Sequence, residues 1–546
     1  AFVEVVMGAY LNPSNDNFRV QVENGTYVDK TMLIEETNKR LNDNDFKFLC
    51  ISRPRRFGKS IAENMLAAYY SKGADSRTLF APYKISQAAS FEKNLNKFNV
   101  IHIDLNALYS EWIITIHDPS QENIPEQQRR LSFIPFVTKK LCAEFKKEFK
   151  DVAFEDGSSV ASSIQQVYEQ KHETFIVIID EYDVLLREQV EENELEIYRG
   201  FLNSLFKNAH LKPALSLAYL TGILPIMKDK VQSKMNEFSK ITMLDADDFA
   251  EFTGFTTEEV KALCKKYNCD FEECKSWYDG YNLKGVEIYN PQAVIKAVPR
   301  SKFKSYWSET SSYEVVAEKI RMNFAGTKED VITMMGGGRV GIEVEAYENT
   351  MSSFNSKDDV FTYLIHLGYL AYDEKEKQCY IPNKEIYEEW KRVVKNTSDY
   401  SETNKIISDS EQLLRDTIAM NEEAVARGLD AAHRHVTSYR NYNNEYALHA
   451  AIYLAYIYAM NNYIIAKELP AGNGCADIVY IPFDKTKETL IVELKYNGSA
   501  SKALEQIKSK KYFDLLEKWN GGILFVGVNY DAESKTHECK IERFEK

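Results

Sequence analysis

The sequence contains no apolar run long enough to cross a membrane. Its longest apolar stretch, residues 446–460, includes His449 and is shorter than the ~20 apolar residues that a bilayer-spanning helix needs. We expect this stretch to be a buried helix and the protein to make no membrane contact. No basic segment followed by an apolar one opens the chain, so the sequence predicts no secretory signal and a cytoplasmic location.

A net positive charge and closely paired cysteines are also absent from the sequence. The net charge is −14, which excludes a generally basic coat for nucleic acid, so any such contact must use local basic patches. The eight cysteines include no Cys-x2-Cys pair. Cys264, Cys269 and Cys274 lack a nearby histidine, which argues against a zinc site, and free thiols fit a reducing cytosol.

The chain is rich in apolar segments that alternate with helical spans. At 546 residues it is expected to fold into three or four domains, because one domain usually holds ~100–200 residues. Apolar runs at residues 46–52, 99–105, 175–179 and 214–222 predict strands. Strands that alternate with helices predict a parallel sheet.

A candidate phosphate-binding loop follows the first of these strands. In residues 53–60 the order is Arg-Pro-Arg-Arg-Phe-Gly-Lys-Ser, and a helical pattern follows. Gly58 would let backbone amides face phosphate, Lys59 would neutralise the β and γ oxygens, and Ser60 would ligate magnesium. The first glycine of the usual motif is replaced by Arg53. The expected nucleotide-binding residues of the loop are Arg55, Arg56, Phe57, Gly58, Lys59 and Ser60, although surface charge is an equal interpretation of the two arginines.

An acidic pair supplies the complementary half of this site. The apolar residues 175–179 are followed by Asp180 and Glu181. A parallel strand is buried on both faces, so such a pair lies at the carboxyl end, where open α/β sheets bind ligands. We expect Asp180 to hold magnesium and Glu181 to polarise the attacking water. The alternative, a helix start that favours acidic residues, explains the charge but not the apolar run.

Thr221 ends a further predicted strand. It either contacts the terminal phosphate of a nucleotide or only begins the turn at Gly222. No arginine lies between Arg199 and Arg300. Ring-forming ATPases usually supply an arginine to the neighbouring subunit from this region, and lysine lacks the bidentate fork, so the sequence argues against a conventional ring motor.

The middle of the chain is less informative. Residues 358–367 predict a helix, and residues 369–372 with 378–381 predict a hairpin. A helix with a hairpin fits either a winged-helix unit or a purely structural connector; the mixed charge at the hairpin tip favours the connector. Residues 336–338 are three glycines, which predict a flexible joint.

A second chemical pattern occupies two predicted strands, residues 474–480 and 489–495. In a hairpin, Asp477 and Glu493 can face each other and share a divalent metal, with Lys495 on the same face. The lysine can orient or deprotonate water or stabilise charge on phosphate. Glu445 could add a third acid. The alternative is a solvated face that carries these charges by chance.

A helix predicted after this hairpin carries a local basic strip. Gln506 and Lys510 are four residues apart and share one helix face. Further lysines nearby are Lys502, Lys508 and Lys511. Such a strip is what a nucleic-acid backbone would need in an otherwise acidic protein.

The order of these motifs resembles a known family. Residues 27–31, 53–60, 179–183 and 277–281 are similar to those of the divergent AAA-ATPase-like family of bacterial proteins, in which arginine for glycine in the loop is typical. The segment from Glu445 to Phe544 resembles the PD-(D/E)XK nuclease superfamily. The resemblance implies a nuclease core of Asp477, Glu493 and Lys495, joined by Glu445 and Gln506.

The predicted fold class is α/β multidomain. We expect a P-loop parallel-sheet ATPase core at residues 1–240, a helical lid and connector with a winged-helix-like part at 241–400, and a restriction-endonuclease-like α/β domain at 401–546. The leading hypothesis is that ATP controls a nuclease that acts on DNA. Its cofactors are ATP and magnesium, with manganese possible at the nuclease, and it allows an oligomer. The alternatives are a non-catalytic nucleotide switch and a structural assembly protein.

Overall fold

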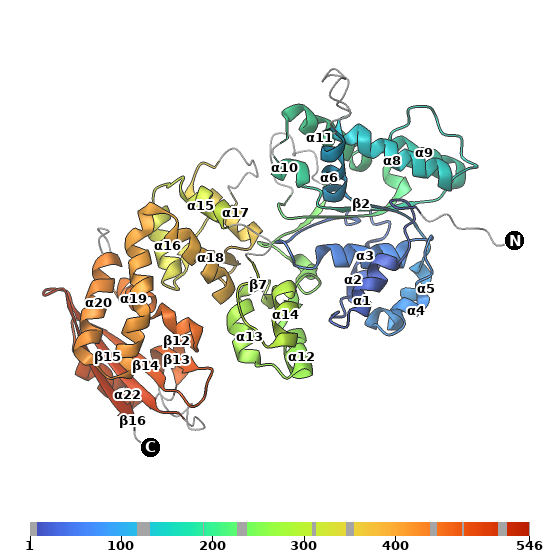
Figure 1. Ribbon diagram of the computed structural model, residues 1–546. Coiled ribbons are helices and arrows are strands. Elements are labelled where there is room, and N and C mark those ends of the chain that lie inside the picture. The colour runs from blue at the N-terminus through green and yellow to red at the C-terminus, as the bar shows by residue number, and fades with distance from the viewer. Residues whose placement is uncertain are drawn as a thin grey trace.

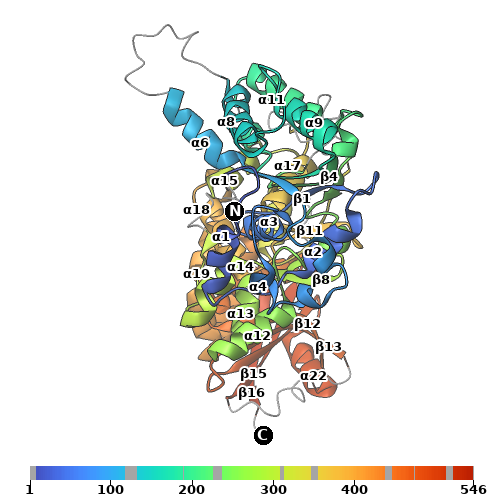
Figure 2. The ribbon, with the colours of Figure 1, turned by 90° about the vertical axis from the view of Figure 1, so that its right-hand side faces the viewer.

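The structure is a computed structural model that describes residues 8–116, 132–188, 190–225, 237–307, 313–345, 354–436, 445–471, 474–511 and 521–544. Two views show a sheet from the N-terminal part and a sheet from the C-terminal part at opposite ends of the molecule (Figures 1 and 2). Two smaller, mostly helical units lie between them. Among the described residues, no helix is long and apolar enough to cross a membrane.

The N-terminal sheet has five parallel strands in the order β2-β3-β4-β1-β5. The bounds are β1 Phe48–Ser52, β2 Asn99–Asp104, β3 Phe175–Asp180, β4 Leu215–Gly222 and β5 Ser239–Ile241. Apolar residues bury β1, β3 and β4 on both faces, as expected of parallel strands between helices. This confirms the predicted parallel α/β core. Because β4 lies between β1 and β3, the carboxyl ends of these three strands meet at one edge.

Helices cover both faces of this sheet (Figure 1). One face carries α1 Asp16–Glu23, α2 Met32–Arg40, α3 Lys59–Tyr70, α4 Arg77–Phe80 and α5 Phe91–Asn94. The other carries α6 Leu105–Ile116, α8 Phe133–Glu148, α9 Val160–Lys171, α10 Val184–Arg187 and α11 Glu192–Phe206. The two layers have separate apolar cores, one on each side of the strands.

A small lid follows the sheet. It contains the three-stranded sheet β6-β8-β7, with β6 Phe255–Thr256, β7 Tyr281–Leu283 and β8 Val286–Tyr289, and the helices α12 Thr257–Tyr267, α13 Phe271–Tyr278 and α14 Pro291–Ala297. Thr256 caps α12 and its side chain accepts a hydrogen bond from the backbone of Glu259. Such a capping box fixes where the helix starts.

The connector is built from α15 Glu314–Ile320, α16 Thr327–Met335, β9 Val340–Gly341, α17 Lys357–Leu367, β10 Ala371–Asp373, β11 Gln378–Tyr380 and α18 Lys384–Lys395. The predicted helix and hairpin are confirmed as α17 and β10–β11, and β9 adds a third strand. The three glycines at residues 336–338 were expected to form a flexible joint, but Gly336 is closely packed. A Cβ on Gly336 would come within 2.8 Å of the Ala450 side chain, so glycine permits close packing of two helices here.

The C-terminal part is a mixed five-stranded sheet in the order β12-β13-β14-β15-β16, in which only β14 and β15 run parallel. The bounds are β12 Tyr463–Ala471, β13 Gly474–Pro482, β14 Thr489–Tyr496, β15 Ile523–Asp531 and β16 Thr536–Phe544. Its helices are α19 Ser401–Ile418, α20 Glu422–Val436, α21 Glu445–Ala455 and α22 Ala500–Lys510. Helices α19, α20 and α21 pack on one face of this sheet and α22 packs on the other, so both faces of the sheet are buried.

One apolar core runs through the lid, the connector and the C-terminal part. It begins at Phe57 in the candidate phosphate loop, continues through Tyr281 and Trp390, and includes Leu448 and Leu494. These side chains are at most 3% exposed. The candidate loop and the C-terminal sheet are therefore joined by continuous packing.

The lid and the connector meet tightly at Gly280. Its φ is +101°, and a Cβ there would lie 1.9 Å from the Pro382 carbonyl oxygen. We expect Gly280→Ala to lower the free energy of unfolding by about 1–3 kcal/mol more than Gly285→Ala, because a backbone atom cannot move aside cheaply. Gly285 is a matched control, since its φ is +84° but a Cβ there would meet nothing within 4 Å. Thermal unfolding measures both, and equal losses would show that the contact is unimportant.

Candidate functional site

The candidate phosphate loop leaves β1 and turns into α3, which begins at Lys59. Gly58 has a φ of +86°, and no atom would obstruct a Cβ, so glycine is required here for its backbone conformation. The first amides of α3 have no partner within the helix, and the helix dipole favours negative charge at this end. The loop therefore offers an anion site of the kind that binds phosphate.

Lys59 lies folded back onto this loop. Its Nζ donates hydrogen bonds to the carbonyl oxygens of Arg53, at 3.0 Å, and Pro54, at 2.9 Å. The side chain is 7% exposed, and burial lowers the pKa of its ammonium. The ammonium group of Lys59 thus lies inside the loop and is hydrogen-bonded to backbone oxygens, whose place the oxygens of a ligand phosphate can take.

Asp180 joins the loop to the two neighbouring strands. Its Oδ2 accepts a hydrogen bond of 2.5 Å from Ser60 Oγ, and its Oδ1 accepts one of 2.7 Å from Thr221 Oγ1. The structure therefore brings together three residues that the sequence singled out. A hydroxyl and a carboxylate are oxygen ligands of the type that magnesium prefers, so Ser60 and Asp180 fit this ion. Thr221 is fully buried and positions Asp180.

Glu181 is held by an arginine that sequence reasoning missed. Its Oε2 accepts a hydrogen bond of 2.5 Å from Arg187, and its own φ is +52°. Arg187 Nε lies 3.2 Å from Asp183 Oδ2, and Asp183 in turn accepts hydrogen bonds from two backbone amides of the segment after β4. The only sequence signal for Arg187 was that it follows Glu181 by six residues; in the structure it is the last residue of the short helix α10.

A buried acid, Glu63, lies beside Asp180 and was also missed. Its side chain is fully buried, and burial, followed by the charge of Asp180, raises the pKa of Glu63 well above its ordinary value. His102 Nε2 is 3.8 Å from Glu63 Oε2, but burial lowers the pKa of His102 to about 4. His102 is therefore neutral at pH 7, so its contact with Glu63 is not an ion pair. Glu63 follows Ser60 by three residues, so the helical period places both on one face.

Arg53, which replaces the usual glycine, faces away from solvent. It is fully buried, donates from Nε to Thr253 Oγ1 at 3.0 Å and from a terminal nitrogen to the Ser52 carbonyl at 2.9 Å. Burial lowers its pKa to about 10. The arginine thus ties the loop to the start of the lid. Arg55 and Arg56, by contrast, are exposed.

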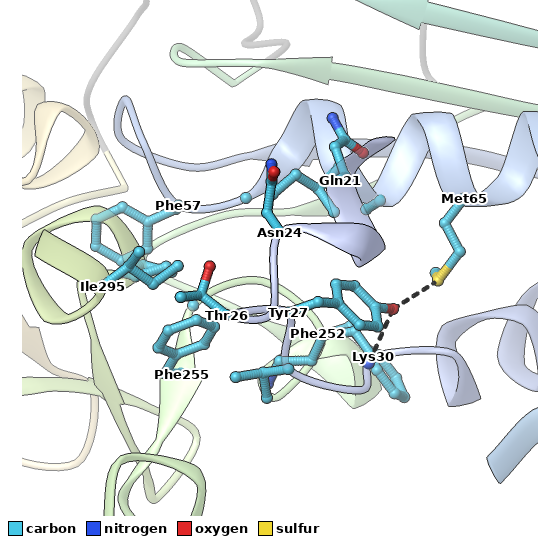
Figure 3. A pocket seen from close by; sticks show the side chains of 16 residues that line it. Gln21, Asn24, Thr26, Tyr27, Lys30, Phe57, Met65, Phe252, Phe255 and Ile295 are labelled. Atoms are coloured by element: carbon cyan, nitrogen blue, oxygen red, sulfur yellow. Dashed lines mark hydrogen bonds between the residues drawn. The ribbon is translucent and has the colours of Figure 1, made fainter. Parts of the chain in front are cut away.

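An apolar pocket of about 160 Å³ opens next to the loop. Figure 3 shows Phe57, Phe255 and Ile295 at one end and Tyr27 and Met65 at the other. The Tyr27 hydroxyl lies 3.6 Å from the Met65 sulfur. The N-terminal segment, α3 and the lid all line this space, which is why no local pattern revealed it. A flat apolar group attached to a phosphate in the loop would fit here.

The second candidate site lies on the β13–β14 hairpin. Ile478 pairs with Val492, which places Asp477 next to Glu493. The Leu494 amide donates a hydrogen bond of 2.7 Å to Asp477 Oδ2. The structure therefore brings the two predicted carboxylates together on adjacent strands.

Glu493 is the most perturbed acid of this site. It is 1% exposed, and burial, together with the charge of Asp477, raises its pKa to about 7. Lys495 Nζ lies 3.2 Å from Glu493 Oε1 and donates to Gln506 Oε1 at 2.7 Å, while the Gln506 amide also contacts Glu493. The other oxygen, Oε2, is buried and has no hydrogen-bond partner among the described residues.

The buried Oε2 of Glu493 indicates whether a divalent metal fits this site. A buried carboxylate oxygen without a partner is costly unless a cation or water completes it, so Asp477 and Glu493 fit a hard cation. Within the described ranges, no group of three metal-ligating side chains was found. The side chain of Glu445, the third predicted ligand, lies outside the described residues, although α21 begins at this position.

The basic strip on α22 is smaller than the sequence predicted. Lys502 and Lys511 are exposed, but Lys508 lies 2.5 Å from Glu542 and its charge is compensated. Gln506 turns toward the acids rather than toward a partner surface. The exposed positive charge near the hairpin is therefore local.

Comparisons with known proteins match one family to each end of the chain. Residues 15–232 match the family described as predicted AAA-ATPase, and residues 443–540 match the PD-(D/E)XK nuclease superfamily. The chain therefore joins an AAA-ATPase-like domain to a PD-(D/E)XK nuclease-superfamily domain, which confirms the resemblance predicted from its motifs.

Individual relatives are distant. An "Uncharacterized protein in vnfD 5'region" of Azotobacter chroococcum mcd 1 is 25% identical over 298 residues, which are 52% of this chain and 51% of that protein. This chain thus matches about half the length of its curated relative. The crystal structure of Cdc6p from Pyrobaculum aerophilum is 8% identical, covering 67% of this chain and 93% of that one, with a TM-score of 0.21. A TM-score this low supports no conclusion.

Proposed function

We propose that ATP binding and hydrolysis in the N-terminal domain control a metal-dependent nuclease in the C-terminal domain that cuts DNA. The observation that carries the nuclease is the buried pair of Asp477 and Glu493, with one carboxylate oxygen left without a partner and Lys495 beside it. The exposed Lys502 on α22 and Lys511 just after this helix support contact with a nucleic-acid backbone.

Asp477 and Glu493 would hold a divalent cation, magnesium or manganese. When bound, such an ion polarises a phosphoryl oxygen and lowers the pKa of bound water. Lys495 is positioned by Gln506 and Glu493 to orient water or to stabilise negative charge on phosphate. Asp477 is oriented by the Leu494 amide, so both acids are fixed by the hairpin.

In the N-terminal domain, Lys59 would leave the loop carbonyls and pair with the phosphates of ATP. Ser60 and Asp180 would hold magnesium, and the apolar pocket beside Phe57 would take the base. Glu181 would orient the attacking water once its contact with Arg187 is rearranged.

Packing supplies a route between the two sites. Phe57 stacks edge-to-face on Tyr281, with ring centroids 5.4 Å apart, and the Tyr281 hydroxyl donates to the Gly368 carbonyl at 2.6 Å. The Gly336–Ala450 contact described above continues this packing to α21. A change of the loop on binding ATP would therefore press on the helix that supports β14.

The second candidate is a nucleotide switch whose C-terminal domain binds nucleic acid or protein without cutting. It is favoured by the presence of only two metal-ligating acids in the described part of the hairpin site. Both candidates permit slow ATP hydrolysis, so strand cleavage separates them.

The deciding experiment is cleavage of single-stranded and duplex DNA by the full chain, with magnesium or manganese, with and without ATP. Metal-dependent cutting that changes at least severalfold with ATP supports the proposal. Cleavage at the same rate with and without ATP would contradict control of the nuclease by the nucleotide. No cleavage under any of these conditions would contradict the nuclease and favour the nucleotide switch.

The raised pKa of Glu493 gives a pH dependence. The folded protein keeps a proton on Glu493 up to about pH 7, whereas the ordinary value is 4.5, so the metal-free domain loses stability as pH rises between these values. A cation binds the carboxylate form, and we expect manganese to raise the unfolding temperature more at about pH 8 than at about pH 5.5. Glu493→Gln is the control and should abolish this difference. An equal shift of the wild type at both pH values would contradict the assignment.

A further inference from the structure

A second cavity lies where the lid, the connector and the nuclease-like domain meet. Its volume is about 320 Å³, within the range of small-ligand pockets, and it lies apart from both sites described above. Ser276 of α13, Lys384 of α18, Tyr453 of α21 and Ile465 of β12 all line it. A molecule bound here would contact all three parts of the protein.

Lys384 is the unusual member of this lining. It is 2% exposed, and its Nζ lies 4.2 Å from the centroid of the Trp277 ring. No hydrogen bond or ion pair joins its ammonium to another residue in the described part of the chain. The aromatic face satisfies one side of the ammonium, but a buried charge without an acceptor is costly.

Two acids near the cavity are matched by other cations, and Glu272, a third acid in the lining, is exposed to solvent. Asp279 lies 3.7 Å from Lys275, and Glu388 lies 2.6 Å from Lys391. Glu273 and Glu388 favour the charged form of Lys384 from a distance, yet desolvation lowers the pKa of Lys384 to about 8. Lys384 therefore carries a positive charge at pH 7 that an anion can neutralise.

Two further features favour an anion with an organic body. Lys384 is the first residue of α18, so the positive end of the helix dipole adds to its charge. Much of the remaining lining is apolar or aromatic, including Ile381, Tyr387, Met460 and Tyr463. Inorganic phosphate alone would leave this apolar surface in contact with water.

We propose that this cavity binds a small organic anion with a flat apolar body, of mononucleotide size or less, whose anionic group pairs with Lys384. The site lies next to Gly280, whose close contact with Pro382 joins lid to connector, and one residue from Tyr281, which stacks on Phe57. Its occupant is thus placed to act on both the nucleotide loop and the nuclease-like domain. The inference requires neither ATP hydrolysis nor DNA cleavage.

Binding is tested by calorimetry on the full chain carrying Lys59→Ala, which removes binding at the first loop. The probes are 5′-AMP, phenyl phosphate and benzoate, and adenosine and benzyl alcohol are the uncharged counterparts. We expect at least one anion to bind at least tenfold more tightly than its uncharged counterpart. Lys384→Met should weaken that binding at least tenfold, whereas Lys395→Met, an exposed change on the same helix, should not.

The unfolding temperature separates loss of a ligand contact from loss of structure. Lys384→Met removes an unpaired buried charge, so the ligand-free variant should be as stable as the parent or more stable. Ile465→Trp, which fills the cavity and keeps the charge, should also abolish binding and decides the matter if Lys384→Met does not fold. Failure of all three anions to bind at millimolar concentration, or binding that survives both substitutions, overturns the proposal.

Discussion

Replacing Asp477 with asparagine is expected to lower metal-dependent DNA cleavage by ~10²–10³-fold, because a metal contributes several kcal/mol of charge stabilisation and ~1.4 kcal/mol corresponds to a factor of ten. Asparagine keeps the shape of the side chain and an oxygen that can still accept the Leu494 amide hydrogen bond. It removes only the charge. The loss should therefore appear in cleavage rates, measured on labelled DNA, while the unfolding temperature without metal is unchanged or higher.

Glu505→Gln is the matched control for this variant. Glu505 is exposed on α22 and precedes Gln506, so its replacement removes one nearby carboxylate without touching the hairpin acids. The cleavage rate should stay within about twofold of the wild type. Equal loss in both variants would mean that general electrostatics near the strip, rather than the pair of Asp477 and Glu493, governs cutting.

Lys59→Ala is expected to reduce ATP hydrolysis by at least ~10²-fold, since phosphoryl transfer depends on positioned positive charge around the phosphates. Two loop carbonyls lose their donor in this variant, but both can be hydrated, so the domain should remain folded. Phosphate release reports turnover, and fluorescent-nucleotide titration reports affinity.

Lys97→Ala serves as the control because Lys97 is an exposed lysine of the same domain, before β2. Its hydrolysis rate should equal that of the wild type. If the nuclease depends on ATP as proposed, Lys59→Ala should also remove the effect of ATP on cleavage and keep the basal rate. ATP-responsive cleavage in that variant would rule out the loop as the control site.

Local patterns predicted the parts of the protein that depend on neighbours in sequence. The loop, its strand and its helix form one continuous segment, so their order alone indicated a phosphate site. The apolar run before Asp180 required a buried strand, which placed the acid at a sheet edge. In the hairpin, alternation along two adjacent strands was enough to bring Asp477 and Glu493 together, because the turn between them is short.

Other features depend on contacts that no local pattern contains. Arg187 contacts Glu181 across a turn in which the backbone of Glu181 adopts a left-handed conformation. The pKa of Glu63 is raised by burial beside β3, and the pocket beside Phe57 is lined jointly by the N-terminal segment, α3 and the lid. The glycine at 336 was predicted to give freedom, but it allows a close approach between helices distant in sequence.

The core that runs from Phe57 to Leu494 also bears on how this protein can be divided. Units joined by a thin linker can be exchanged between proteins, but here a cut before α19 would uncover an apolar face that α16 and α18 now cover. A nuclease fragment made alone would therefore associate with itself or lose its fold. The two candidate sites therefore stand on one continuously packed body, and a substitution in the core that favours one site must also be tolerated by the other.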